Sequence, residues 1–227
     1  MSRIRENFLR VRERIDSAAR RAGRSGEDVA LCAVTKLVGV AEIREIVDAG
    51  AVILGENRVQ EAEPKIREVG SLAGRVTWHM IGHLQRNKAR RAVELFDEIE
   101  SVDGLALARR LSDLGEEGGA PVPILVEVRM SDEPAKTGVP PEEAPDVVGE
   151  IRRLPGVELK GLMAMAPFTD DESRVRSSFA GLRELRDRLG GTAELPELSM
   201  GMTADFEIAV EEGSTLVRIG AGLFGRG

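Results

Sequence analysis

Short apolar runs recur along the chain from residue 29 to its end, separated by segments in which apolar residues follow a longer spacing. The runs are rich in small and β-branched side chains and too short for helices, which is typical of strands buried on both faces of a parallel sheet. We predict eight strands, over Val29–Thr35, Ala51–Leu54, Val76–Ile81, Glu98–Val102, Val122–Val128, Leu159–Met165, Glu197–Met200 and Thr215–Ile219.

The segments between these runs carry apolar residues at intervals of three and four, which predicts amphipathic helices. Clear examples are Ile43/Ile46/Val47, Val59/Ala62/Ile66/Val69, Leu107/Leu111/Leu114 and Phe179/Leu182/Leu185/Leu189. A capping-box pattern from Thr169 to Glu172 is expected to open the last of these helices, and Gly190-Gly191 to close it. Before the first strand, one apolar stripe predicts a further helix that ends at Gly23, through Ile4, Phe8, Val11, Ile15, Ala18 and Ala22.

Alternation of strands and helices implies parallel pairing with right-handed crossovers. Eight repeats predict an α/β fold, a closed (β/α)8 TIM barrel with an extra N-terminal helix. An open doubly wound sheet is the alternative. No linker or change of composition divides the chain, so residues 1–227 are expected to form a single domain.

Composition narrows the classes of function. Of 227 residues, 42% are hydrophobic and 31% charged, which suits a soluble globular protein. The net charge of −7 argues against a general nucleic-acid binder, and the absence of an 18-residue apolar run argues against a membrane span. The first residues lead into a charged helix rather than a signal segment. The single cysteine, Cys32, fits a reducing cytoplasm and is interpreted as a small apolar filler.

Polar groups stand where several predicted strands end. In a parallel barrel these ends share one face, where active sites are built. The residues concerned include Lys36, Asn57, His79, Met165, Ser199, Met200 and Arg218. Lys36 is a candidate Schiff-base nucleophile, because partial burial disfavours a protonated amine. The alternative is a lysine that keeps its amine in water.

The last predicted strand is followed by glycines that suggest an anion site. Gly220 to Gly225 match G-x-G-x-x-G, but too little chain follows for a dinucleotide-binding fold. In a barrel, the loops after the last two strands often cradle a phosphate. Gly220 permits close approach of a ligand, and Gly201 and Thr203 are expected at a helix start. Ordinary turn chemistry is the alternative.

Two further patterns are interpreted as structural and not as functional sites. His79 and His83 form H-x-x-x-H across a strand end rather than on one helix face, so no metal site is expected. The basic run from Arg86 to Arg91 is interpreted as a solvated helix face, with a protein or nucleic-acid contact as the alternative.

Taken together, the ordered motifs of the chain resemble those of the pyridoxal-phosphate homeostasis proteins, single-domain relatives of the alanine racemase barrel. The resemblance extends from about residue 4 to Gly225. It rests on "AVTK" (33–36), "GENRVQE" (55–61), "WHMIGHLQRNK" (78–88), "AKTGV" (135–139), "GLMAMAP" (161–167), "LSMGMTADFEIA" (198–209) and "STLVRIGAGLFG" (214–225).

The resemblance implies that Lys36 carries pyridoxal 5′-phosphate as an internal aldimine. It also implies roles for the rest of the site, with Arg218 facing the pyridine nitrogen. Asn57, Met200 and neighbours (His79, Met165, Ser199, Gly201) would surround the cofactor, and Thr203, Gly220 and Ala221 would hold its phosphate. This chain departs from the family pattern at Ala221, where a hydroxyl residue is usual, and at Arg58 and Arg129.

The resemblance leaves two functional classes, a racemase and a non-catalytic carrier of the cofactor. Racemisation needs a base on each face of the substrate, and in alanine racemase the second base is a tyrosine from another domain. This chain has no tyrosine, and His79, His83 or Glu56 could replace one only in a new arrangement. We therefore predict a monomeric carrier that buffers vitamin B6 and meets apoenzymes transiently. A Schiff-base sugar aldolase is a third, weaker alternative.

Overall fold

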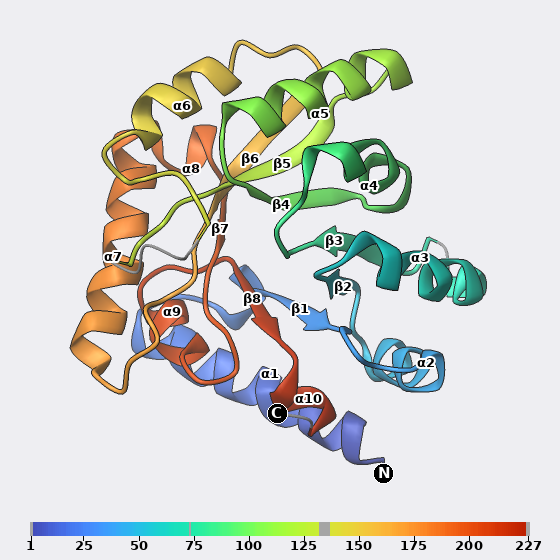
Figure 1. Ribbon diagram of the computed structural model, residues 1–227. Coiled ribbons are helices and arrows are strands. Elements are labelled where there is room, and N and C mark those ends of the chain that lie inside the picture. Colours follow the sequence, from blue (N-terminus) through green and yellow to red (C-terminus); the bar gives the residue numbers. More distant parts are fainter. Residues whose placement is uncertain (1, 73, 132–136, 226–227) are drawn as a thin grey trace.

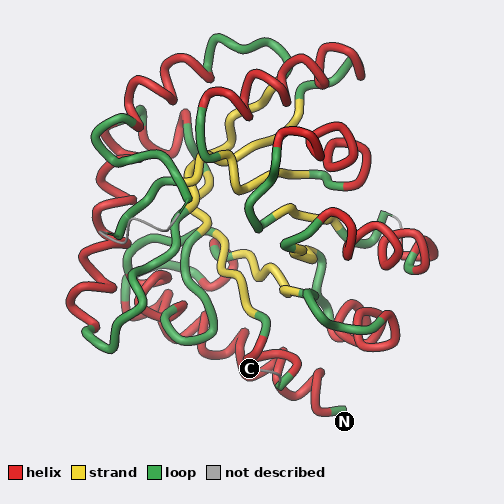
Figure 2. Tube along the Cα trace, viewed as in Figure 1, coloured by secondary structure: helices red, strands yellow, loops and turns green. Residues whose placement is uncertain are grey.

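In the computed structural model, residues 2–72, 74–131 and 137–225 are described, and eight parallel strands close into one barrel. Each strand pairs with its neighbours in chain order, and the last pairs with the first, with Cys32 opposite Arg218. Figure 2 shows the strands as a central ring with helices outside it. The strands are β1 Ala30–Val34, β2 Ile53–Glu56, β3 Thr77–Met80, β4 Glu98–Val102, β5 Val122–Glu127, β6 Val157–Met163, β7 Glu197–Ser199 and β8 Leu216–Ile219. The barrel prediction is confirmed, and the open-sheet alternative is wrong.

Helices cover the outside of the barrel, and they include those predicted from the apolar spacing as well as two short ones that were not predicted, α8 and α10. They are α2 Val40–Ala49, α3 Val59–Glu68, α4 Ala89–Leu95, α5 Leu105–Gly118, α6 Ala144–Ile151, α7 Glu172–Arg188, α8 Gly191–Glu194, α9 Phe206–Glu211 and α10 Ala221–Phe224, with short 3-10 turns η1 Gly26–Asp28, η2 Gly70–Leu72 and η3 Arg86–Lys88. Their apolar stripes form the core against the outer face of the strands, as Ile46, Phe179 and Leu54 illustrate. Within the described residues, no helix combines the length and apolar character that a membrane span requires.

The extra N-terminal helix, α1 Arg3–Arg21, packs against α2, α9 and α10 (Figure 1). Its predicted stripe is buried from Ile4 to Ala18, and Ile15 is fully so, whereas Ala22 is the exposed C-cap residue. Asn7 fixes the helix to the other end of the chain, because its Nδ2 donates to the carbonyl of Leu223 over 2.8 Å. The added helix is therefore confirmed, and it covers the elements that carry the last loops of the barrel.

Two predicted helix starts are wrong. Helix α7 is capped by Asp171, whose Oδ1 accepts from the N–H of Ser173 at 2.9 Å, while Thr169 instead accepts from the N–H of Asp171. Helix α9 begins at Phe206, so Thr203 lies in the turn before it. Asp205 accepts from the N–H of Met202 at 2.6 Å, which holds that turn outside the helix.

Alternation along the strands divides their residues between the outer core and the barrel interior. Gly55 faces inward, because a Cβ placed there would lie 2.6 Å from the Sγ of Cys32. Polar side chains also face inward, including His79, Glu100, Ser199 and Arg218, which contact one another across the barrel. The barrel interior below the carboxyl ends of the strands is therefore filled by small and polar side chains.

Candidate functional site

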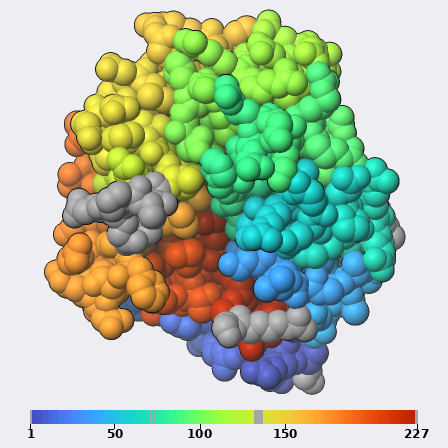
Figure 3. All heavy atoms as spheres, in the orientation of Figure 1, coloured from blue at the N-terminus to red at the C-terminus, as the bar shows by residue number. Residues whose placement is uncertain are grey.

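A cavity of about 940 Å³ opens at the carboxyl ends of the strands. Figure 3 shows that face of the molecule hollowed between the C-terminal segment and the segments coloured blue and teal. Residues of β1, β5, β6 and β8, of helix α10 and of the loops that follow β1, β2, β3, β5, β6, β7 and β8 line the cavity: Val34, Lys36, Leu37, Val38, Asn57, Ile81, Gly82, His83, Glu127, Thr137, Met163, Met165, Met202, Thr203, Ala204, Arg218, Gly220, Ala221 and Phe224.

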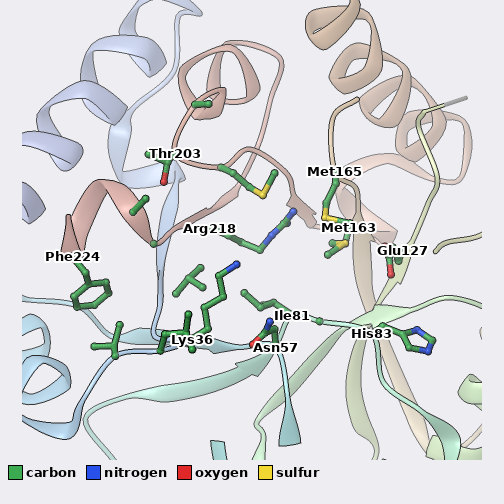
Figure 4. Close-up of a pocket in the computed structure, with 18 of the residues that line it drawn as sticks. Lys36, Asn57, Ile81, His83, Glu127, Met163, Met165, Thr203, Arg218 and Phe224 are labelled. Atoms are coloured by element: carbon green, nitrogen blue, oxygen red, sulfur yellow. The ribbon is translucent and has the colours of Figure 1, made fainter. Parts of the chain in front are cut away.

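Lys36 reaches into this cavity from the end of β1, and Arg218 reaches into it from β8 (Figure 4). Lys36 is an exposed residue whose side chain lines the cavity, which favours the alternative of a lysine that keeps its amine in water. The next residue, Leu37, has φ of 60° although it is not glycine. A branched residue in that left-handed region is strained, and such strain concentrates at functional sites. The chain thus turns sharply just after the amine-bearing residue.

A buried ion pair holds the strand end behind Lys36. The Nζ of Lys65 donates to the carbonyl of Thr35 and to Oε1 of Glu56, each at 2.8 Å. Thr35 also donates its hydroxyl to Glu56 Oε1 at 2.7 Å. Glu56 is fully buried in this cluster and does not line the cavity. Glu56 is therefore a support for the turn and is not placed to act as a base at Lys36.

Arg218 forms the floor of the cavity with only 4% of its surface exposed. Its Nη2 donates to the carbonyl of Ala164 at 2.9 Å, and its Nη1 donates to the hydroxyl of Ser199 at 2.5 Å. Ser199 in turn donates to Glu100 Oε2, whose carboxylate lies 3.9 Å from Nη1. Both nitrogens at the end of the guanidinium are thus held by buried acceptors.

His79 lies beneath this floor and does not line the cavity. Its Nδ1 is 2.8 Å from Glu100 Oε1 and 3.5 Å from Glu98 Oε1. Burial lowers the pKa of His79, but the hydrogen bond and the charge of Glu100 raise it above its usual value. Burial raises the pKa of Glu100, yet His79 and Arg218 hold it below its usual range. Glu100 is therefore the ionised member of this buried group.

The loops after β7 and β8 meet at one side of the cavity. The hydroxyl of Thr203 accepts from the N–H of Gly222 at 3.3 Å, and Gly220 and Ala221 line the wall beside it. A Cβ on Gly222 would lie 3.2 Å from the methyl carbon of Thr203, so the two loops approach closely. Gly201 has φ of 97° and its carbonyl accepts from the N–H of Arg218 at 3.0 Å. Gly201 supports this wall from behind rather than lining it.

The structure brings together seven of the eleven residues singled out from the sequence. Those that line the cavity are Lys36, Asn57, Met165, Thr203, Arg218, Gly220 and Ala221. His79, Ser199 and Gly201 support it from below or behind. Met200 is wrongly placed by the sequence argument, because its neighbour Ser199 faces inward and alternation turns Met200 into the outer apolar core.

Asn57 carries a polar atom that has no hydrogen-bond partner in the described part of the chain. Its Oδ1 is buried and has no hydrogen-bond partner among the described residues, although the side chain lines the cavity. Gly82 packs against it so closely that a Cβ there would lie 2.6 Å from Asn57 Cβ. An acceptor held in the wall of a cavity and left unpaired is suited to a ligand that donates a hydrogen bond.

Two titratable groups of the cavity wall were not predicted from the sequence. Glu127 was not considered, and His83 was named only as a possible base without a position in the site. Glu127 is 3% exposed and accepts from the Thr137 hydroxyl at 2.9 Å, and burial raises its pKa. The alternation of side chains along β5, which turns Glu127 toward the barrel interior, could have identified it. His83 pairs with Asp103 at 3.1 Å, and its ring points away from Lys36 (Figure 4).

Arg58 and Arg129, at which the chain departs from the family pattern, do not line the cavity. Arg58 pairs with Glu61 at 2.9 Å and borders an adjoining groove of about 380 Å³. The N–H of Arg129 donates to the carbonyl of Val139 at 2.9 Å. In the "AKTGV" segment, Ala135 and Lys136 lie outside the described residues, whereas Thr137 lines the cavity.

Comparison with known proteins gives consistent matches over nearly the whole chain. The model of the alanine racemase N-terminal domain matches residues 3–226. The pyridoxal phosphate homeostasis protein of Pseudomonas aeruginosa is 42% identical over 99% of this chain and 96% of its own length. A protein of unknown function from Bifidobacterium adolescentis superposes with a TM-score of 0.93 at 38% identity, covering 98% of this chain and 94% of that one. PipY of Synechococcus elongatus with PLP bound gives 0.84 at 37% identity, covering 98% and 100%.

The buried carboxyl of Glu98 predicts a pH dependence of stability. Burial raises its pKa to about 8 from the ordinary 4.5, so between these values the folded protein holds a proton that the unfolded chain has lost. The free energy of unfolding should therefore fall as pH rises from 6 to 8, by about 2 kcal/mol. The Glu98→Gln variant should show a much smaller fall in urea unfolding measured at both pH values, with the remainder contributed by His79, whose pKa is also raised. An exposed control, Glu94→Gln, should keep it, and equal slopes in all three proteins would contradict the assignment.

Proposed function

Since this chain belongs to the pyridoxal phosphate homeostasis family, built on the alanine racemase N-terminal domain, we propose that it binds pyridoxal 5′-phosphate and carries it rather than racemising amino acids. The observation that carries the proposal is one cavity holding an amine, a guanidinium and a glycine-lined loop pair. These are the groups that an aldehyde, a pyridine ring and a phosphate require.

The residues present fit the cofactor. Lys36 supplies an accessible amine for a Schiff base with the aldehyde, and Asn57 Oδ1 offers an unpaired acceptor beside it. Thr203 and the backbone of Gly220 and Ala221 form the wall that would hold the phosphate. The apolar sides of the cavity suit a planar ring, and they include Met163, Met165 and Ile81.

Arg218 favours a carrier over a catalyst. When bound, the cofactor's power to stabilise carbanions depends on a protonated ring nitrogen. A guanidinium only donates hydrogen bonds, so Arg218 facing that nitrogen would leave it unprotonated. The hydrogen bonds to Ser199 and Ala164 keep the guanidinium in place.

The position of the other titratable groups also favours a carrier. The chain has no tyrosine, Glu56 supports the turn outside the cavity, and His79 lies under the floor. His83 points away from Lys36 (Figure 4). Glu127 is the carboxyl of the far wall, engaged by Thr137. A second base facing Lys36 across the ring is thus lacking among the described residues that line the cavity.

We further propose that one barrel domain spans residues 1–227 and acts in the cytoplasm as a monomer, passing the cofactor to apoenzymes. The single cysteine, Cys32, can form no internal disulfide, and this usage supports a reducing compartment. The exposed position of Lys36 supports transfer, since an incoming amine can reach it through the open mouth.

Borohydride trapping tests the role of Lys36. The purified protein loaded with pyridoxal phosphate should show a visible absorbance band, and reduction followed by peptide mapping should place the label on Lys36. Lys36→Ala should abolish both the band and this label while leaving the thermal unfolding of the cofactor-free protein nearly unchanged, because the side chain is exposed. The control Lys160→Ala should behave as the parent. A band that survives Lys36→Ala at full intensity would overturn the proposal.

Exchange with deuterated water tests the absence of racemase activity. Loss of one general base costs on the order of 10²–10⁴ in rate, so the loaded protein should exchange the α-proton of L-alanine far more slowly than a racemase does. Proton NMR and chiral chromatography give the readouts. Rapid exchange with accumulation of D-alanine would establish the racemase alternative.

Ala221 tests the assignment of the phosphate wall. Ala221→Thr adds a hydroxyl that can donate to a charged acceptor, a bond worth about 1.5–3 kcal/mol when its geometry is good. Binding of pyridoxal phosphate should therefore tighten, while binding of pyridoxal, which has no phosphate, should barely change. Fluorescence titration with both ligands gives the comparison. Equal tightening for the two would place residue 221 away from the phosphate.

A further inference from the structure

The floor of the cavity is the end of a longer hydrogen-bonded chain inside the barrel. It runs from Arg218 through Ser199 to Glu100 and from there to His79, linking β8, β7, β4 and β3. Glu100 and Ser199 are 0% exposed, and His79 is 6% exposed. Of the four residues in this hydrogen-bonded series, Arg218 alone lines the cavity.

The direction of each hydrogen bond in this chain is fixed by chemistry. A guanidinium cannot accept, so the Ser199 hydroxyl accepts from Arg218 and must give its own proton to Glu100. An ionised carboxylate cannot donate, so His79 donates its Nδ1–H to the other oxygen. Glu100 thus has one oxygen held by Ser199 and the other by His79, which leaves its carboxylate a single orientation.

Glu100 also supplies the negative charge of this hydrogen-bonded chain beside Arg218, while Glu127 on β5 and Asp205 in the turn before α9 interact with the same guanidinium electrostatically from other elements. Oε2 of Glu100 lies 3.9 Å from Nη1 of Arg218, and both groups are almost wholly shielded from water. A buried cation without such a partner is costly and raises the positive potential around it. That potential acts on the cavity above, where the amine of Lys36 lies.

A metal ion is a weaker interpretation of the same residues. His79, Glu98 and Glu100 offer three ligand atoms within 4.8 Å of one another. However, His79 Nδ1 and Glu100 Oε1 are 2.8 Å apart and engage each other in a hydrogen bond. The second oxygen of Glu100 is already occupied by Ser199.

We propose that Glu100 is a positioning residue which, through Ser199 and with its own orientation fixed by His79, aims the guanidinium of Arg218 and offsets its charge. It thereby sets the pH at which the Schiff base on Lys36 loses its proton, and with it the readiness of the protein to release its cofactor. The inference rests on the proposed function.

A pH titration of the visible absorbance band tests the proposal. Glu100→Gln keeps the shape but removes the charge, so the positive potential above Arg218 rises. The protonated Schiff base then becomes less favourable, and the midpoint of the titration should fall by roughly one pH unit. Glu98→Gln is the matched control. It lies two residues earlier on β4, contacts His79 and should leave the midpoint unchanged below pH 8, where Glu98 is neutral.

A double-variant cycle separates action through Arg218 from a direct effect. In an Arg218→Gln background, adding Glu100→Gln should shift the midpoint much less, because the part of the effect that acts through the guanidinium is gone. Urea unfolding of the cofactor-free proteins gives a second readout. Glu100→Gln should lower the unfolding midpoint, and the double variant should recover part of the loss because no unpaired buried charge remains. Glu100→Asp, which keeps the charge, should restore most of the wild-type titration.

Each outcome has one meaning. A wild-type protein without a visible band would refute the proposed function itself. A wild-type band whose midpoint is unmoved by Glu100→Gln, or moved equally by Glu98→Gln or in the Arg218→Gln background, would refute the role of Glu100 alone. If Glu100→Gln does not fold, Ser199→Ala carries the test, since it cuts the same link without removing a charge. Its midpoint should move in the same direction by a smaller amount, and an unchanged midpoint would refute the role.

Discussion

Closure of the parallel barrel is the constraint on which the rest of this structure depends. Once β8 pairs with β1, every strand has one side facing the helices and one side facing an interior that water cannot fill. Each inward side chain must then be small, be apolar or find a polar partner inside. Gly55 and Cys32 satisfy this requirement by size, and Glu100 and Arg218 satisfy it by pairing.

The same constraint explains why the functional groups differ in accessibility. Lys36 stands two residues beyond the end of β1 and keeps its amine in the open cavity, whereas Arg218 lies within β8 and is held by buried acceptors. One cation is free to react and the other is fixed. A carrier of a reactive aldehyde needs this division, because it must exchange its covalent bond with ligand while keeping the ring in a constant environment.

The support behind Lys36 follows the same logic on the other face of the strands. Glu56 points outward from the barrel and would be an unpaired buried charge without Lys65, which also binds the carbonyl of Thr35. The ion pair therefore joins β1, β2 and α3 immediately behind the strained turn at Leu37. Local strain at the site is thus held by contacts that lie outside it.

The sequence by itself determined the repeat of strands and helices, the barrel, the added helix and the residues that stand at the strand ends. These depend on local periodicity and on turn residues, which are read within a few positions of the chain. It also placed Lys36, Thr203 and Gly220 at one face.

Only the tertiary structure decided which side each strand residue faces, because a shift of one residue reverses inside and outside. For this reason Ser199 faces the barrel interior while Met200 lies in the apolar core, and His79 lies below Arg218 and does not line the cavity. The pairing of Arg218, Ser199, Glu100 and His79 joins four strands that are distant in sequence, so no local pattern could reveal it. It exists because barrel closure brings these residues together where water is absent and each must find a partner.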